Sequence, residues 1–294
     1  MRVPDNLTYA SADDPALKRA VIRLLERVSG KRRLERVYGR IENSVAGRPE
    51  FWDAALEGLG IKAAFDGPGV NSIPADGPLV LIANHPFGIL DGMVMCRMAS
   101  RMRDMWRVLI NADIAAIDHL NEYFLPIDFR PIPEATKTNI ATKQRAVEAL
   151  RAGGAVVIFP SGGIATAPKI VGKARELEWK LFVMKLLRIR GAQVVPVYFH
   201  GQNSVLFHAA SRVSMTLRLS LVIRELTRKM GGVVHATVGT PLSLADLPGE
   251  NPQEQLASLQ DRVFALRSHA APVVSTNGRV HPTLAYGFAA DESE

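Results

Sequence analysis

The sequence of 294 residues contains a single cysteine, Cys96. One cysteine cannot form an intrachain disulfide, and it excludes zinc sites built from several cysteines. This scarcity fits a reducing compartment. Cys96 lies in an apolar helical pattern with Met93, Val94 and Met95, so we expect it in the core and not as a nucleophile.

Long apolar runs are also missing. No stretch approaches the roughly 18–20 uninterrupted apolar residues that span a bilayer. Residues 1–15 carry acidic residues and have no continuous apolar core, so we do not expect a secretory signal there. We therefore expect a soluble or surface-bound protein.

Several well-known motifs are absent. There is no Gly-x-Ser-x-Gly elbow, which argues against a serine hydrolase of the α/β type. There is no P-loop and no dinucleotide-binding Gly-x-Gly-x-x-Gly after a strand. The histidines do not cluster with metal-ligand spacing, and RNA-binding aromatic signatures are missing. The sequence therefore argues against nucleotide-, metal- and RNA-dependent classes.

The charge balance is positive, with 36 Lys and Arg residues against 29 Asp and Glu residues, a formal charge of +7. A basic balance indicates an anionic partner: nucleic acid, an acidic membrane or a phosphorylated substrate. The hydrophobic share of 47% is that of an ordinary globular protein and excludes a disordered chain.

Helical patterns come first along the chain. Residues 14–30 have apolar residues at helical spacing, with Asp14 as a candidate cap and Gly30 as a candidate end. Two further helices are predicted, at residues 31–47 and 51–60. We expect residues 1–77 to form an N-terminal helical region that can contact a membrane.

After Pro78 short apolar runs of strand length alternate with helical segments, which predicts an α/β domain over residues 78–269 with a mostly parallel central sheet flanked by helices. The expected strands are 79–83, 106–110, 155–159, 194–199 and 233–239. The expected helices are 89–103, 134–152, 173–190 and 252–269. Segment 213–224 fits a strand or a basic helix, and we favour the helix. Residues 270–294 lack periodicity, so we expect a loose tail.

The first candidate motif is residues 83–92, directly after an apolar strand. Pro86 disfavours a helical conformation at His85, and Gly88 permits a left-handed turn. Asp91 would then lie in the first turn of the next helix, where its carboxylate could hold one imidazole nitrogen and leave the other as a base. The alternative is a loop histidine bonded to backbone, with Asp91 as a helix cap.

Three further motifs follow strands. Residues 159–169 form a Pro-Ser-Gly-Gly turn whose N–H groups suit an anion or a developing oxyanion, or form a plain turn. Arg130 could clamp a phosphate or carboxylate, or form a surface salt bridge to Asp128 or Asp104. His200, Gln202 and Asn203 could line a cleft at a strand end. His200 as the catalytic base is a competing interpretation that lacks a nearby carboxylate.

The order of these motifs resembles the four ordered blocks of the glycerolipid (lysophospholipid) acyltransferase superfamily. The blocks correspond to residues 84–92, 126–130, 159–163 and 195–197, and the likeness extends to 239–242. The first block and the pair Asn203-Ser204 are similar to the bacterial branch often labelled "hemolysin" or ornithine-lipid type.

The resemblance implies specific roles. His85 would be the general base and Asp91 its orienting partner. The polar head of the acceptor would be held by Arg130 and the turn residues Pro160, Ser161, Gly162 and Gly163, with Asn84 and Gly88 as further substrate-binding residues. The sequence departs from the family pattern in two places. Five residues separate His85 and Asp91 where four are usual, and Ser161, Gly163 and Ile164 replace the usual Glu, Thr and Arg.

The resemblance also implies a function. The protein would transfer a fatty acyl group from an acyl thioester, on acyl carrier protein or CoA, to the hydroxyl of a lysophospholipid or lyso-aminolipid. No metal or cofactor and no nucleic acid would be required. The missing Glu and Arg make a plain glycerol-3-phosphate-type acceptor less credible than a lyso-aminolipid. The alternative is a non-catalytic lipid- or membrane-binding protein that keeps the fold.

A lipid substrate would place the protein peripherally at the cytoplasmic face of an anionic membrane. Basic amphipathic helices would make this contact, unless their basic side chains form a solvated face. The candidate side chains are Lys18, Arg19, Arg23, Arg27, Lys31, Arg32, Arg33, Arg212, Arg218, Arg224, Arg228 and Lys229.

Overall fold

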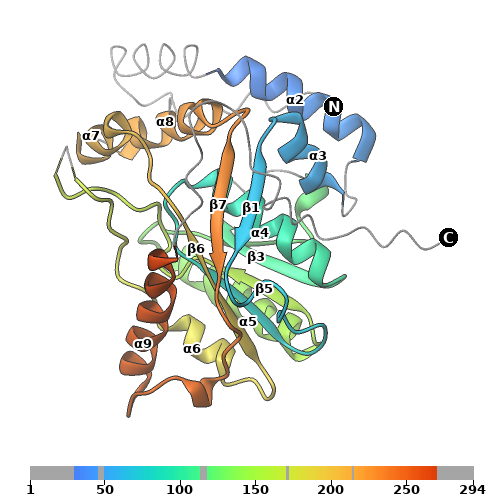
Figure 1. Ribbon diagram of the computed structural model, residues 1–294, viewed down its shortest axis with the longest axis vertical. Helices are drawn as coiled ribbons and strands as arrows, with labels where there is room; N and C mark the ends of the chain where they lie inside the picture. The colour runs from blue at the N-terminus through green and yellow to red at the C-terminus, as the bar shows by residue number, and fades with distance from the viewer. Residues whose placement is uncertain (1–29, 46–49, 113–117, 170–171, 214, 270–294) are drawn as a thin grey trace.

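The computed structural model describes residues 30–45, 50–112, 118–169, 172–213 and 215–269. They form one seven-stranded sheet with helices on both faces (Figure 1). The predicted fold class is therefore confirmed. The expected helix at 14–30 and the expected tail at 270–294 lie outside the described residues.

The sheet is parallel except at one pair. Its order is β1 (Lys62–Asp66), β7 (Val233–Val238), β6 (Gln193–Phe199), β2 (Leu79–Ala83), β5 (Ala155–Ile158), β3 (Trp106–Asn111) and β4 (Phe124–Ile127). Only β6 and β7 pair antiparallel. β2 lies near the middle, with β5 on one side and β6 on the other, and all five of its residues are buried.

Two strands at the edges of the sheet were not predicted. β1 has the sequence Lys-Ala-Ala-Phe-Asp, which lacks the β-branched residues that mark strands. It pairs with β7, so the N-terminal region expected to be helical also contributes a strand. β4 contains Pro126, which argues against a central strand but is tolerated at an edge.

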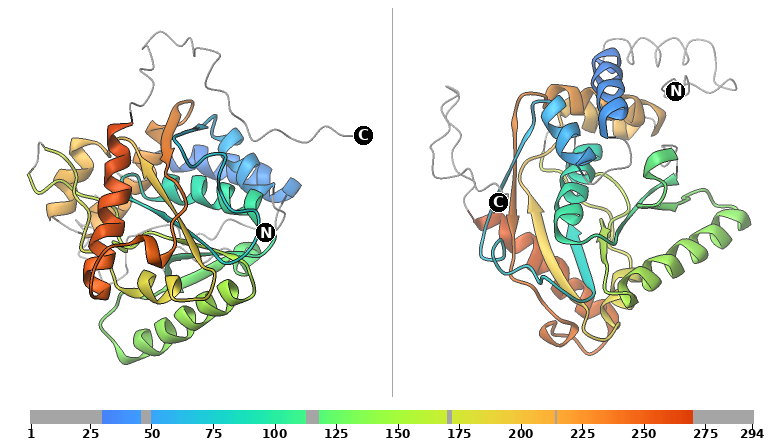
Figure 2. Two further views of the ribbon diagram at one scale, coloured as in Figure 1. Left: turned by 60° about the horizontal axis from the view of Figure 1, so that its bottom comes forward. Right: turned by 90° about the vertical axis from the view of Figure 1, so that its right-hand side faces the viewer.

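The helices form two layers (Figure 2). One face of the sheet is covered by α2 (Lys31–Val45), α3 (Phe51–Gly58), α4 (Ile89–Met102) and α8 (Met215–Arg228). The other face is covered by α5 (Pro133–Arg151), α6 (Phe182–Leu187) and α9 (Pro252–Ala265). α7 (Val205–Val213) packs on α8. Short 3-10 helices lie at Asp118–Leu120, Leu244–Asp246 and Leu266–Ser268.

The expected helix at 173–190 is mostly wrong. Only Phe182–Leu187 is helical, and residues 172–181 form an irregular segment. Thr166 and Arg175 exchange two backbone hydrogen bonds of 2.9 Å, and Gln202 bonds to Gly172 and Ala174. These long-range bonds use backbone groups that a helix would need for its own hydrogen bonds.

The helix predicted over 213–224 is confirmed within α8.

The topology brings the predicted motifs to one edge. β2 is parallel to both β5 and β6, so the carboxyl ends of these three strands lie side by side. His85 follows β2, the 159–163 turn follows β5 and His200 follows β6. This is the edge at which open α/β sheets bind ligands.

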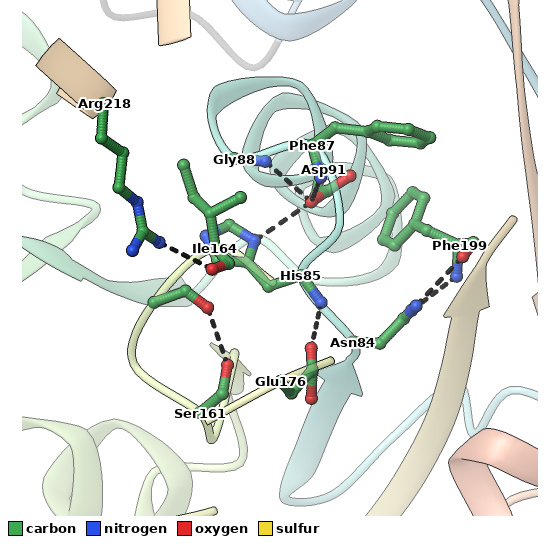
Figure 3. Close-up of polar contacts among 11 residues, drawn as sticks. Asn84, His85, Phe87, Gly88, Asp91, Ser161, Ile164, Glu176, Phe199 and Arg218 are labelled. Carbon is green, nitrogen blue, oxygen red and sulfur yellow. Dashed lines mark hydrogen bonds and ion pairs between the residues drawn. The ribbon is translucent and has the colours of Figure 1, made fainter. Parts of the chain in front are cut away.

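Asn84 joins β2 to β6 beyond the last paired residues. Its side-chain amide donates to the Phe199 carbonyl at 3.0 Å and accepts from the Phe199 N–H at 2.6 Å (Figure 3). Asn84 is buried. Both polar ends of its side chain are thus used by the backbone, and the substrate contact expected of Asn84 stays a prediction.

Asn84→Ala should leave two buried backbone groups of Phe199 without their partner. Each orphaned group costs about 1–3 kcal/mol, so the free energy of unfolding should fall by several kcal/mol in a urea titration. Asn121→Ala is the control because Asn121 is exposed, and it should change stability by no more than about 0.5 kcal/mol. Equal stability of the two variants would show that the hydrogen bonds of Asn84 to Phe199 do not stabilise the fold.

Candidate functional site

His85 and Asp91 lie together at the carboxyl end of β2. The Nδ1 atom of His85 is 3.1 Å from Oδ2 of Asp91, which is the distance of an ion pair but without hydrogen-bond geometry. The Asp91 side chain is fully buried, while 16% of the His85 side chain is exposed. One side of the imidazole therefore faces a buried carboxylate, and the ring keeps access to the surface.

The turn between the two residues has the predicted form. α4 begins at Ile89, so Asp91 lies in its first turn, and Gly88 has a φ of 85°. Oδ2 of Asp91 accepts hydrogen bonds from the N–H groups of Phe87 at 2.8 Å and Gly88 at 3.0 Å. A Cβ on Gly88 would lie 2.6 Å from Cδ1 of Ile164, the end of a flexible side chain, so the positive φ is what favours glycine here.

The imidazole of His85 is held by its surroundings. Its ring stacks on Phe159 with centroids 4.1 Å apart. Its carbonyl accepts from the N–H of Ala165 at 2.8 Å, and its N–H donates to the carboxylate of Glu176 (Figure 3). The backbone and the ring are thus held by contacts from two other segments, residues 159–169 and 172–181.

Glu176 is a site residue that the sequence analysis missed. Its other carboxylate oxygen accepts from the indole N–H of Trp179 at 2.6 Å. Burial raises the pKa of the Glu176 carboxyl, and the bonds from Trp179 and His85 oppose that shift. Glu176 lies in the expected helix 173–190, and no local pattern indicates that it reaches a histidine 91 positions earlier.

The 159–163 turn lies beside His85, since Phe159 forms part of the stack. Pro160 is buried, and the buried Ser161 hydroxyl donates to the carbonyl of Gly163 at 3.0 Å. The N–H of Gly162 donates to Phe159, and that of Gly88 to Asp91, so neither is available to an oxyanion. Among the hydrogen bonds of the described residues, none has the N–H of Gly163 as its donor.

Arg130 forms the surface salt bridge that was one of its two interpretations. Its guanidinium contacts the Asp128 carboxylate at 2.5 Å, and its side chain is 70% exposed. This pairing holds the pKa of Asp128 below its usual range. The neighbouring Phe129 lies 3.3 Å from where a Cβ on Gly162 would stand, so this loop touches the 159–163 turn.

Several basic residues expected to face a membrane point inward instead. Nη2 of Arg218 donates to the carbonyl of Ile164 at 2.6 Å, and Nζ of Lys229 lies 4.0 Å from the centre of the Phe87 ring. Arg224 lies 3.9 Å from the buried carboxylate of Glu225. Arg228 lies 4.0 Å from the same carboxylate, but its side chain stays 54% exposed.

The outward-facing candidates are fewer. Arg33, Arg212 and Arg228 are exposed. Lys18, Arg19, Arg23 and Arg27 lie outside the described residues, as do the side chains of Lys31 and Arg32. No helix in the described ranges combines the length and apolar character needed to cross a bilayer.

The residues after β6 have structural partners. His200 shares a 2.8 Å hydrogen bond with Thr237, which donates to Asp66 at 2.6 Å, and burial lowers the pKa of His200. Gln202 binds the 172–181 segment, while the amide of Asn203 is buried without a hydrogen bond.

Cys96 is buried, which raises the pKa of its thiol and confirms its place in the core.

The chain is similar to known proteins in sequence and structure. A family model described as "Acyltransferase" matches residues 21–268. A lyso-glycine lipid O-acyltransferase of Bacteroides thetaiotaomicron is 28% identical over 182 residues, 60% of this chain and 62% of that protein, so less than two thirds of its length is spanned. A protein of the same name from Phocaeicola vulgatus is 23% identical over 206 residues, 66% of this chain and 68% of that protein.

A solved structure also aligns with this chain. It is the 1-acyl-sn-glycerophosphate (LPA) acyltransferase PlsC of Thermotoga maritima, at 13% identity and a TM-score of 0.46. The alignment covers 85% of this chain and 95% of that chain.

Glu176→Gln should destabilise the site, because the amide nitrogen would face one of the two N–H donors that the carboxylate now accepts. We expect the free energy of unfolding at neutral pH to fall by about 1–3 kcal/mol in a urea titration. Glu178→Gln is the matched control, since Glu178 is exposed on the same segment, and should cost no more than about 0.5 kcal/mol. If the two variants are equally stable, the bonds assigned to Glu176 are wrong.

Proposed function

We propose that this chain, which belongs to the acyltransferase family, transfers a fatty acyl group from an acyl thioester to the hydroxyl of a lyso-lipid. The donor would be a thioester of acyl carrier protein or of CoA. The observation that carries the proposal is the 3.1 Å approach of His85 Nδ1 to the buried Asp91 carboxylate. The names of the similar lyso-glycine lipid O-acyltransferases support a lyso-lipid acceptor.

In this proposal neutral His85 is the general base. Its Nε2 atom takes the proton of the acceptor hydroxyl while the oxygen attacks the thioester carbonyl. The tetrahedral intermediate then collapses, the C–S bond breaks, and the imidazolium returns the proton to the leaving thiolate. Asp91 holds the ring orientation and stabilises the imidazolium. The N–H of Gly163 is the candidate donor to the oxyanion.

Acceptor and donor would meet at the carboxyl edge of β2 and β5. Holding the two reactants together could lower the activation free energy by about 7–11 kcal/mol. The exposed side chains of Phe129 and Leu177 lie beside Gly162 and Gly163, respectively. They would offer apolar contacts to an acyl chain at the mouth of the site.

His85→Gln should lower the rate of acyl transfer by about 10²–10⁴-fold, because the side chain can no longer accept the hydroxyl proton. The assay supplies purified protein with acyl carrier protein or CoA thioesters and a panel of lyso-lipids. His200→Gln tests the competing base and should keep the rate within a few-fold.

A large loss of rate in His200→Gln together with a nearly unchanged rate in His85→Gln would assign the base to His200. A wild-type protein that binds lyso-lipids but transfers no acyl group would favour the non-catalytic alternative.

The same proposal includes a peripheral contact with the membrane at its cytoplasmic face. On α7 the apolar side chains of Val205, Leu206 and Val213 are 50%, 47% and 76% exposed. Arg212 is exposed on the same helix. Exposed apolar residues beside a cation suit the interface of an anionic bilayer.

Leu206→Asp combined with Val213→Asp should weaken binding to vesicles that contain anionic lipid, because the charges oppose insertion of α7. Co-sedimentation at low and high salt measures it, and added salt should weaken wild-type binding. Ile140→Asp is the control, since Ile140 is 65% exposed on α5. Vesicle binding that stays the same with added salt, without anionic lipid and in the α7 variant would contradict the proposed contact.

A further inference from the structure

Arg218 is a partly buried cation that lacks an acidic partner. One N–H of its guanidinium donates to the carbonyl of Ile164, and the guanidinium lies 5.8 Å from the centre of the Phe207 ring. No carboxylate of the described chain forms an ion pair with it, in contrast to Arg224 and Arg228 beside Glu225. A guanidinium has five N–H donors, so most of its capacity is left for a ligand.

Arg218 lies next to the proposed catalytic histidine. Its guanidinium bonds to Ile164, and the next residue, Ala165, donates to the carbonyl of His85 at 2.8 Å. Figure 3 shows Arg218 and His85 on the two sides of Ile164. The backbone of residues 164–165 therefore connects the guanidinium of Arg218 to the backbone of His85.

The turn beside Arg218 adds further donors. None of the described hydrogen bonds uses the N–H of Gly163 or Ile164. A Cβ on Gly163 would lie 3.9 Å from Nη2 of Arg218, so the turn and the guanidinium border the same space. A guanidinium with nearby backbone N–H groups is a suitable receptor for a carboxylate.

The charge favours a carboxylate over a phosphate monoester. Arg218 is the cation that reaches the Ile164 carbonyl, whereas Lys229 lies over the Phe87 ring and Arg130 contacts Asp128. One cation balances one carboxylate, but a phosphate monoester carries nearly two negative charges at pH 7. Ile164 also stands where the similar family has an arginine, so α8 supplies the guanidinium that this turn lacks.

We propose that Arg218 binds the carboxylate of an amino-acid head group on the acceptor lipid. This inference rests on the proposed function and specifies its acceptor. The carboxylate would pair with Arg218 and the N–H of Ile164, which leaves the N–H of Gly163 to the oxyanion. The hydroxyl of the same lipid would then reach His85.

The test compares three acceptors: a lyso-glycine lipid, its methyl ester and a lysophosphatidate of equal chain length. We expect wild-type kcat/KM to be highest for the free acid. Arg218→Gln should lower kcat/KM for the acid about 10–100-fold, mainly through KM. For the methyl ester, Arg218→Gln should leave kcat/KM unchanged. Arg218→Lys should keep part of the preference. Arg145→Gln, at an exposed arginine of α5, is the control and should keep all of it.

Two results would overturn the inference. An equal loss for acid and ester in Arg218→Gln would show that Arg218 only supports the turn. A wild-type preference for the lysophosphatidate that Arg218→Gln abolishes would make the ligand a phosphate.

Binding measured by calorimetry without a donor separates this inference from the proposed function. If no acceptor is acylated, the proposed function fails. Acid-selective binding that Arg218→Gln abolishes would nevertheless support the carboxylate site. Unchanged acid binding by Arg218→Gln would overturn the site, whatever the catalytic result.

Discussion

The carboxylate of Asp91 is the group on which the site depends. A fully buried charge is costly unless hydrogen bonds and an opposite charge compensate it. Here one oxygen accepts two backbone N–H groups of the preceding turn and lies 3.1 Å from His85. The same carboxylate therefore closes the turn and begins α4, and it lies beside the imidazole. Gly88 makes this geometry possible because its φ is positive.

The sheet and the 172–181 segment support that turn from the other side. Asn84 fixes the end of β2 to β6, immediately before His85. Glu176 accepts the backbone N–H of His85, and Lys180 donates to the carbonyl of Pro160 at 3.0 Å. A segment far along the sequence thus links the two motifs that follow β2 and β5. Rigid support of this kind would suit the proton transfer proposed for His85.

The parts of the site that could be predicted are those whose causes are local. Pro86 and Gly88 set the turn that separates His85 from Asp91, and both residues lie within it. The continuous apolar strands β2, β5 and β6 could be identified because burial on both faces leaves a clear pattern. β1 and β4 were missed because their residues are ordinary and their stability comes from pairing at a sheet edge.

Glu176 and Arg218 could not be found from sequence for a related reason. Each acts through contacts with residues more than fifty positions away, and each lies in a segment with a plausible local interpretation. Residues 173–190 resembled a helix, and the arginines of α8 resembled a solvated or membrane-facing stripe. In both cases long-range hydrogen bonds, from His85 to Glu176 and from Arg218 to Ile164, determine where the side chain lies.

The most direct measurement of the central claim is the rate of acyl transfer by an Asp91→Asn variant. Asparagine can still accept the N–H groups of Phe87 and Gly88, but it removes the negative charge beside His85. Single-turnover transfer from an acyl thioester to a lyso-lipid should slow about 100-fold or more while the variant stays folded. A folded Asp91→Asn protein that transfers the acyl group at the wild-type rate would contradict the account.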